Sequence, residues 1–284
     1  MRRNQTWHVV DPVTDHEDLV HNLMRELGIS RVLADLLVKR NLSDVEKARS
    51  FLYPRIEALS SPLSIPGMTE ALNRIRKAIG HKKKVVIYGD YDVDGICSIT
   101  ILKECLEKFL PEVDYYIPNR FQEGYGLNPD AIREIHSRGC EFLITVDCGI
   151  ASVEEVALAS RLGMEVVITD HHHPGSALPE AAAVVNPKLA PAGGSELAGV
   201  GVVFYLIRAL SRVFHEIDPL EWLDLVALGA VADIVPLTGD NRILVVEGMR
   251  PLKETGRPGL RALIESAGLR NRELQYWHLG FILA

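Results

Sequence analysis

The sequence predicts an α/β fold built on a doubly wound, mostly parallel sheet of five strands, with a helical N-terminal region and a helical C-terminal portion. Two observations carry this prediction. Short runs rich in Val and Ile, without polar alternation, recur through the middle of the chain, as in strands buried on both faces. Segments with helical spacing of apolar residues separate these runs, and such alternation favours a parallel sheet covered by helices.

The first 80 residues are expected to form a helical region of their own. Ser30 can cap the second of its helices and Ser43 the third, in which Glu46 occupies the capping-box position. Three prolines between residues 54 and 66 break up the segment before the last of these helices. The helices of this region are predicted over residues 15–27, 31–39, 44–51 and 68–79.

The α/β domain is predicted to span residues 81–240. Its strands are expected at residues 84–88, 113–117, 141–146, 165–169 and 183–185, with helices over 96–109, 128–137 and 152–162. Later helices are expected over 200–214, 219–230, 242–253 and 259–266. Residues 241–284 are interpreted as a helical segment leading to a C-terminal domain outside this chain, because the chain stops in an apolar run and chain ends normally fray into water.

Composition excludes some classes of protein. The chain has 284 residues, 47% of them hydrophobic and 24% charged, which is ordinary for a globular protein. Its net charge of -7 disfavours a general polyanion-binding surface, although an acidic nuclease can still carry a local basic groove. The four cysteines form no C-x-x-C pair, which disfavours structural zinc and favours a reduced, cytoplasmic protein. No apolar run is long enough for a membrane span.

Acidic and histidine-bearing segments follow the predicted strands. Residues 90–94 follow the first strand, Asp147 the third, and residues 170–172 the fourth. The carboxyl ends of parallel strands share one edge of the sheet, where ligands bind. Carboxylates gathered there repel one another unless cations lie among them. The sequence therefore predicts a metal site, with two ions.

Residues 90–94 carry three aspartates at alternate positions. In an extended segment such residues point the same way, so Asp90, Asp92 and Asp94 are expected to present their carboxylates to one side. An EF-hand loop counted from Asp90 would need Glu at its twelfth position, where Ile101 stands. Calcium is therefore rejected.

The residue types favour a particular kind of metal. Histidine among several carboxylates suits Mn²⁺ or Mg²⁺ better than structural zinc. Two such ions ~3.5–4 Å apart can hold a hydroxide and stabilise the displaced oxygen in phosphoester hydrolysis. Asp170 is expected to orient a ligand histidine from behind. Asp233, which precedes a loop, is more typical of a cap or turn when judged by spacing alone.

The loop after the second strand, residues 118–127, also opens on this edge. Arg120 could pair bidentately with a phosphate, and Tyr125 could stack or donate a hydrogen bond. An ordinary Gly-bearing loop remains equally open at this point. For Gly199 and Gly201, which flank a helix start, close packing is favoured over phosphate binding.

These motifs together resemble the DHH phosphoesterase superfamily, which is named for the triplet at residues 170–172. The resemblance extends to residues 51–54, 88–95, 119–120, 123–127, 146–149, 185–188, 199–201 and 232–233. Within the superfamily the chain is similar to bacterial exonucleases that degrade single-stranded DNA in the 5′→3′ direction. Such proteins continue into further domains that do not follow Ala284.

The resemblance implies a division of labour among the site residues. One metal ion would be held by Asp94, Asp147, His171 and Asp233. Asp147 would bridge to a second ion held with Asp90 and Asp92. His172 would face the scissile phosphate as an electrostatic or acid group, beside the candidate phosphate contacts Arg120 and Tyr125. The implied catalytic residues are thus Asp147, His171 and His172.

The leading hypothesis is a metal-dependent exonuclease that hydrolyses single-stranded DNA to mononucleotides in DNA repair and recombination. Single-stranded DNA would be its partner, with a single-strand-binding protein and a helicase as further candidates and no membrane. One alternative is a small-molecule phosphodiesterase or pyrophosphatase of the same superfamily. Another is a non-catalytic scaffold, although every expected ligand position is filled. A dinucleotide-binding enzyme is rejected because carboxylates stand where the pyrophosphate would bind.

Overall fold

The computed structural model describes residues 16–191 and 195–284, which form two compact units that divide between Ala58 and Leu59. The first unit contains helices α1 (Glu17–Leu27), α2 (Arg31–Val38) and α3 (Val45–Leu52) and the short η2 (Ile56–Ala58). Its helices pack around a small core that includes Val20, Leu23 and Leu37. The predicted start of the first helix at Asp15 lies outside the described residues.

Capping decides where two of these helices begin. Ser30 caps α2, as predicted, and its hydroxyl accepts a hydrogen bond from Leu33 N at 3.3 Å. The prediction that Ser43 caps α3 was wrong by one residue. Asp44 is the N-cap, and its carboxylate accepts from Lys47 N at 2.9 Å. A negative charge there also interacts favourably with the positive end of the helix dipole.

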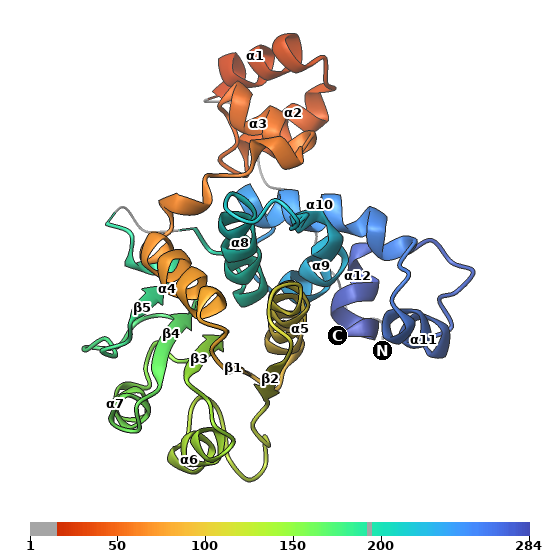
Figure 1. The fold of residues 1–284 in the computed structure, drawn as a ribbon. Helices are drawn as coiled ribbons and strands as arrows, with labels where there is room; N and C mark the ends of the chain where they lie inside the picture. Colours follow the sequence, from red (N-terminus) through yellow and green to blue (C-terminus); the bar gives the residue numbers. More distant parts are fainter. Residues whose placement is uncertain (1–15, 192–194) are drawn as a thin grey trace, which may run out of the picture. The chain divides into compact units, whose positions relative to one another are not determined.

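The second unit is built on a five-stranded sheet, as predicted (Figure 1). Its strands run in the order β2-β1-β3-β4-β5, and every neighbouring pair is parallel. The strands β1 and β3 are buried along their whole length, as expected for Val- and Ile-rich runs at the centre of a parallel sheet. The bounds are β1 (Val85–Gly89), β2 (Val113–Tyr116), β3 (Phe142–Val146), β4 (Glu165–Thr169) and β5 (Ala183–Val185).

Helices cover both faces of this sheet (Figure 1). On one face lie α6 (Pro129–Ser137) and α7 (Val153–Arg161), which close a core with apolar residues of the central strands. On the other face lie α4 (Met68–Gly80), α5 (Val93–Glu107) and α8 (Gly199–Ser211). The doubly wound arrangement follows from the right-handed crossovers that join parallel strands.

The rest of the second unit is helical. Helix α9 (Leu223–Ala232) is buried along most of its length and packs against both α5 and α10 (Gly239–Lys253). Further elements are α11 (Pro258–Ser266), α12 (Tyr276–His278), the π-turn η6 (Leu279–Leu283) and the short η3 (Pro62–Ser64), η4 (Pro187–Leu189) and η5 (Pro219–Trp222). Within the described ranges, every helix is too short or too polar to cross a membrane.

The start of α5 differs from the prediction. The helix begins at Val93, three residues before the expected start at residue 96, because the Asp92 carboxylate caps it by accepting from Gly95 N at 2.9 Å. The expectation that residues 90–94 form one extended segment was therefore wrong. Asp90 follows β1, Asp92 is the cap, and Asp94 lies in the first turn of the helix.

Candidate metal centre

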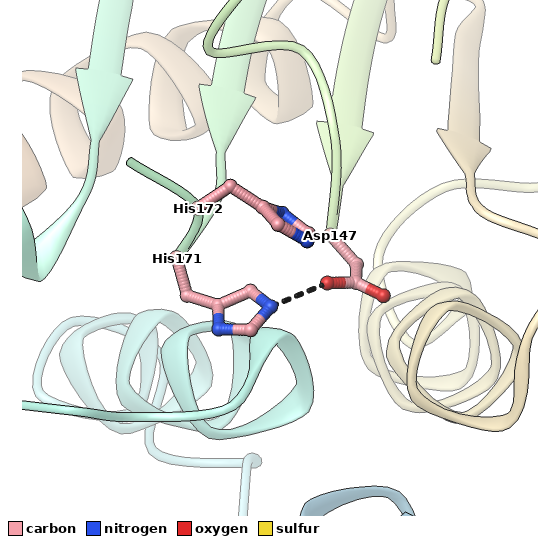
Figure 2. A group of neighbouring side chains, drawn as sticks. All are labelled: Asp147, His171 and His172. Carbon is pink, nitrogen blue, oxygen red and sulfur yellow. Dashed lines mark ion pairs between the residues drawn. The ribbon is translucent and has the colours of Figure 1, made fainter. Parts of the chain in front are cut away.

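Three neighbouring strands deliver the polar residues to one edge of the sheet. Asp90 follows β1, Asp147 follows β3, and residues 170–172 follow β4, so the predicted convergence is observed. Figure 2 shows Asp147, His171 and His172 side by side below these strand ends. Three overlapping groups bring potential ligand atoms within 4.8 Å of one another. They are Asp94 with His171 and Asp233, Asp90 with Asp92 and Asp147, and Asp147 with His171 and His172.

At the centre of these groups lies a buried pair of atoms without ordinary partners. Asp147 Oδ1 lies 3.1 Å from His171 Nε2 (Figure 2), and Asp233 Oδ2 lies 3.7 Å from the same nitrogen. Figure 2 marks the 3.1 Å contact as an ion pair, which requires a protonated His171, but its geometry is not that of a hydrogen bond. Within the part of the chain that the structure describes, neither Asp147 Oδ1 nor His171 Nε2 has a hydrogen-bond partner. Buried polar atoms that lack a hydrogen-bond partner are expected where those atoms serve as ligands of a cation.

The backbone that presents Asp147 is held in an unusual conformation. Asp147 has a φ of 60°, in the left-handed region that non-glycine residues rarely adopt. Its N–H donates to Thr169 O at 3.0 Å, and the Thr145 hydroxyl donates to Cys148 O at 2.8 Å. The Thr169 hydroxyl in turn donates to Thr145 O at 2.9 Å. These buried bonds fix the turn that points the Asp147 carboxylate toward His171.

Asp94 is held by the start of α8. Its two carboxylate oxygens accept from Gly199 N at 2.6 Å and Val200 N at 2.8 Å. The positive end of the helix dipole favours the carboxylate at this position. A Cβ atom at Gly199 would lie 2.4 Å from Asp147 Oδ1, so only glycine fits. The packing interpretation of Gly199 is therefore confirmed.

Burial and mutual repulsion disfavour the charged forms of the clustered carboxylates. Burial, followed by repulsion from neighbouring carboxylates, raises the pKa of Asp94 and of Asp147 well above the ordinary value. Burial also raises the pKa of Asp90 and of Asp233. Ionising all four together is unfavourable without a cation among them. The donor set, carboxylates with one imidazole, suits Mn²⁺ and Mg²⁺.

Asp170 differs from the other aspartates in its electrostatics. Burial disfavours its charged form, but hydrogen bonds from His172 and Ile150 outweigh burial and lower its pKa. One oxygen accepts from His171 N at 2.7 Å, His172 N at 3.0 Å and His172 Nδ1 at 2.8 Å; the other accepts from Ile150 N at 2.9 Å. Asp170 is therefore a carboxylate that holds the imidazole of His172 and the backbone N–H groups of both histidines, while the ring of His171 makes no bond to it.

The loop between β2 and α6 places Tyr125 beside His172, and Arg120 close enough to Asp90 to favour its charged form. The Tyr125 hydroxyl lies 3.1 Å from His172 Nδ1 and 3.5 Å from the carbonyl oxygen of Asp147. The Arg120 guanidinium lies over the ring of Tyr91, 5.4 Å from its centroid. Tyr91 itself stands between two of the site aspartates in the sequence.

Sequence reasoning missed the residue that anchors this loop. The Glu123 carboxylate accepts from Asn119 N at 2.6 Å, the Tyr116 hydroxyl at 2.7 Å and Asn128 Nδ2 at 3.0 Å. Although partial burial opposes ionisation, these bonds lower the pKa of Glu123. The only hint in the sequence was the inclusion of Glu123 in a family-like motif.

Comparison with known proteins was consistent with this geometry. Residues 84–230 match the family described as "DHH family, N-terminal domain". The single-stranded-DNA-specific exonuclease RecJ of Bacillus subtilis is 44% identical over 98% of this chain and 35% of its own length. The RecJ of Escherichia coli is 39% identical over 96% of this chain and 48% of its own length. The chain thus spans between one third and one half of these curated relatives.

Solved structures of RecJ have a fold similar to that of this chain. The crystal structure of RecJ in complex with Mn²⁺ from Thermus thermophilus has a TM-score of 0.80 and 31% identity, covering 94% of this chain and 38% of that one. A crystal structure of exonuclease RecJ bound to manganese has a TM-score of 0.72 and 35% identity, covering 79% of this chain and 57% of that one. The family resemblance carried by residues 170–172 and the motifs that accompany them is therefore confirmed, and the chain belongs to the DHH family.

Proposed function

We propose that this chain is the catalytic portion of a metal-dependent exonuclease that hydrolyses single-stranded DNA from its 5′ end to mononucleotides, in DNA repair and recombination. The observation that carries the proposal is the unpartnered contact of Asp147 Oδ1 with His171 Nε2, set among buried carboxylates. The relatives named as single-stranded-DNA-specific exonucleases support the choice of substrate. The catalytic domain is proposed to span residues 81–240.

The proposed cofactor is a pair of Mn²⁺ or Mg²⁺ ions. One ion would be held by Asp94, Asp147, His171 and Asp233, and the second by Asp147 with Asp90 and Asp92, in agreement with the grouping of ligand atoms. When bound, the ions would supply an activated water and stabilise charge on the phosphate oxygens. The related structures that contain Mn²⁺ or Mg²⁺ support this assignment.

His172 is proposed to donate a proton to the departing 3′ oxygen. The Asp170 carboxylate accepts from Nδ1, so Nε2 is the nitrogen available to the phosphate. The imidazole is 42% exposed, which leaves it accessible from the open side of the site. Asp170 would stabilise the charged imidazole and hold its ring in position, as a carboxylate behind a catalytic histidine does.

Single-strand selectivity is proposed to come from the loop after β2. Arg120 offers a guanidinium for a backbone phosphate, and Phe121 is 94% exposed beside it. Unpaired bases can stack on such aromatic side chains, whereas paired bases cannot leave their duplex without cost. A single-strand-binding protein and a helicase are proposed as partners. The cytoplasm is the proposed location, in keeping with four cysteines that remain free thiols.

The proposal is tested by digesting single strands labelled at either the 5′ or the 3′ end with Mn²⁺ present. A 5′ label should appear at once in mononucleotides, while the 3′ label stays on strands that shorten gradually. Duplex DNA of the same sequence should resist cleavage. Cleavage of a cyclic dinucleotide alone would instead support a small-molecule phosphodiesterase, and metal binding without hydrolysis would support a scaffold.

A further inference from the structure

Lys188 is a cation near the metal centre that has no role in the reaction proposed above. The buried Asn186 ties it to the DHH segment. Asn186 Nδ2 donates to the carbonyl oxygen of His172 at 2.9 Å, and Asn186 Oδ1 accepts from Lys188 N at 2.8 Å. This cap begins the short η4, directly after β5. The backbone of Lys188 is therefore fixed relative to His172 by one side chain.

The side chain of Lys188 reaches the segment that leads into α8. Its Nζ lies 3.8 Å from Glu196 Oε2, three residues before α8 begins at Gly199. The carbonyl oxygen of Glu196 accepts from Asn241 Nδ2 at 2.5 Å, and the same nitrogen donates to Pro236 O at 3.2 Å. Pro236 lies in the loop that follows the proposed metal ligand at the end of α9. Lys188 therefore lies next to a segment that is bonded to this loop.

The charge of Lys188 acts on the metal centre, yet its own partner is weak. Burial raises the pKa of Asp233, and the charges of His171, His172 and Lys188 oppose this rise. The Lys188 side chain is only 17% exposed, whereas Glu196 is 61% exposed and lies at the outer limit of an ion pair. A pair with so exposed a carboxylate contributes little to stability. A largely buried ammonium in this position gains free energy from an anion that binds it more closely.

The proposed substrate carries such an anion beside the scissile phosphate. The metal ions would hold the oxygens of the scissile phosphate itself. In the described part of the chain, Lys188 makes its ion pair with Glu196 and none with the metal ligand Asp233, so its ammonium borders the ions without replacing them. An enzyme that removes one nucleotide at a time from the 5′ end meets the next internal phosphate on the 3′ side. Resting on the proposed function, we propose that Lys188 Nζ exchanges Glu196 for the phosphate that follows the scissile one.

The test removes the ammonium and leaves the metal ligands in place. Lys188→Gln should raise KM for single-stranded DNA about tenfold, the size expected for one hydrogen bond to a charged group. Its Mn²⁺ affinity, measured by calorimetry, should stay at the wild-type value. Glu196→Gln should lower KM, because it frees the ammonium from its present partner. Lys82→Gln is the matched control, since Lys82 is exposed and precedes β1, at the opposite edge of the sheet.

Strand length separates a phosphate contact from a structural role. A 5′-phosphorylated dinucleotide has a scissile phosphate and none after it, whereas a trinucleotide has one more. Lys188→Gln should raise KM for the trinucleotide and leave KM for the dinucleotide unchanged. Binding is then measured with Mn²⁺ on a labelled strand that resists hydrolysis because a methylene group replaces the 3′ oxygen of its first linkage. The slope of log affinity against log salt concentration should become shallower by about 0.7 in Lys188→Gln, which corresponds to one phosphate of a single strand.

The outcomes separate this inference from the proposed function. An equal rise in KM on the dinucleotide and the trinucleotide, or an unchanged salt slope, would overturn the phosphate contact while leaving the nuclease intact. If Lys188→Gln does not fold, Glu196→Gln decides, and an unchanged KM in that variant would overturn the contact. A wild-type chain that binds Mn²⁺ but cleaves no strand would contradict the proposed function. The salt slope, which needs no hydrolysis, would then decide the contact of Lys188 by itself.

Discussion

The carboxylate oxygen Oδ1 of Asp147 and the ring nitrogen Nε2 of His171 face each other at 3.1 Å in the protein interior without a hydrogen bond. Leaving two buried polar atoms without a hydrogen bond is costly, so a group that satisfies both would stabilise the site. A cation that both atoms ligate would do so. Changes to either atom, or to the residues that enforce the contact, should therefore alter metal binding and stability together.

Replacing Asp147 should stabilise the metal-free protein. The pKa of Asp147 is raised in the folded state, above its unfolded value of about 3.9. The folded state therefore binds the proton more tightly, and stability falls as pH rises through the folded pKa. At pH 8 the metal-free Asp147→Asn variant should unfold at a higher temperature than the wild type, and at pH 4 this difference should shrink.

Addition of Mn²⁺ should reverse that order and raise the unfolding temperature of the wild type alone, as measured by scanning calorimetry. Each kcal/mol corresponds to about 2–4 °C in a chain of this size. Asp147→Ala should likewise keep its fold and lose hydrolysis. Equal stabilisation of wild type and variants by Mn²⁺ would rule out Asp147 as a shared ligand.

Adding one methyl group at Gly199 should disturb the metal centre. A Cβ there would lie 2.4 Å from Asp147 Oδ1, so Gly199→Ala must displace the carboxylate or the start of α8. The affinity for Mn²⁺, measured by calorimetry, should fall at least about tenfold, or ~1.4 kcal/mol. Gly201→Ala is the control, since its Cβ meets only the Leu197 side chain, at 3.3 Å. Equal Mn²⁺ affinity in both variants would refute the argument.

Neutralising Asp170 should slow the chemical step. An Asp170→Asn side chain lacks the negative charge and turns an NH₂ group toward N–H donors that Asp170 now satisfies. The expected loss in kcat is about 10–100-fold, the usual effect of removing a carboxylate behind a site histidine. Asp130→Asn, on an exposed side chain of α6, is the control for a charge change alone. An unchanged kcat would show that His172 needs no such support.

Glu123→Gln should weaken substrate binding without affecting the metal. The amide nitrogen of Gln would face hydrogen-bond donors, so the loop with Arg120 and Tyr125 would lose its anchor. We expect KM for single-stranded DNA to rise about tenfold, equivalent to ~1.4 kcal/mol, with a smaller change in kcat. Mn²⁺ affinity should stay at the wild-type value. A fall in unfolding temperature with no change in KM would mean that Glu123 is only structural.

The strands were predictable because their signal is local. A run such as residues 142–146 is short, apolar except for Thr145 and rich in β-branched residues, which is typical of a strand buried on both faces. The start of α5 was misplaced because Asp92 was interpreted as a ligand in an extended segment, whereas its carboxylate also caps the helix. One carboxylate can serve both purposes, and the alternate spacing of the aspartates suggested a ligand but did not reveal the helix cap.

The residues that sequence reasoning could not place are those brought in by tertiary packing. Asp233 approaches His171 from the end of α9, so nothing near it in the sequence marks it as part of the site. Gly199 contacts Asp94 and Asp147 from the start of α8, on another part of the chain. For Asp233, only the family resemblance supplied the assignment.

The central claim is that the edge formed by β1, β3 and β4 is a two-metal centre. Crystals of the chain soaked in Mn²⁺, with anomalous diffraction recorded near the manganese edge, test it most directly. Two anomalous peaks are predicted, one among Asp94, Asp147, His171 and Asp233, the other among Asp90, Asp92 and Asp147. Both peaks should vanish or weaken in Asp147→Ala. If a crystal soaked to saturation in Mn²⁺ shows no anomalous peak beside Asp147 and His171, the account is contradicted.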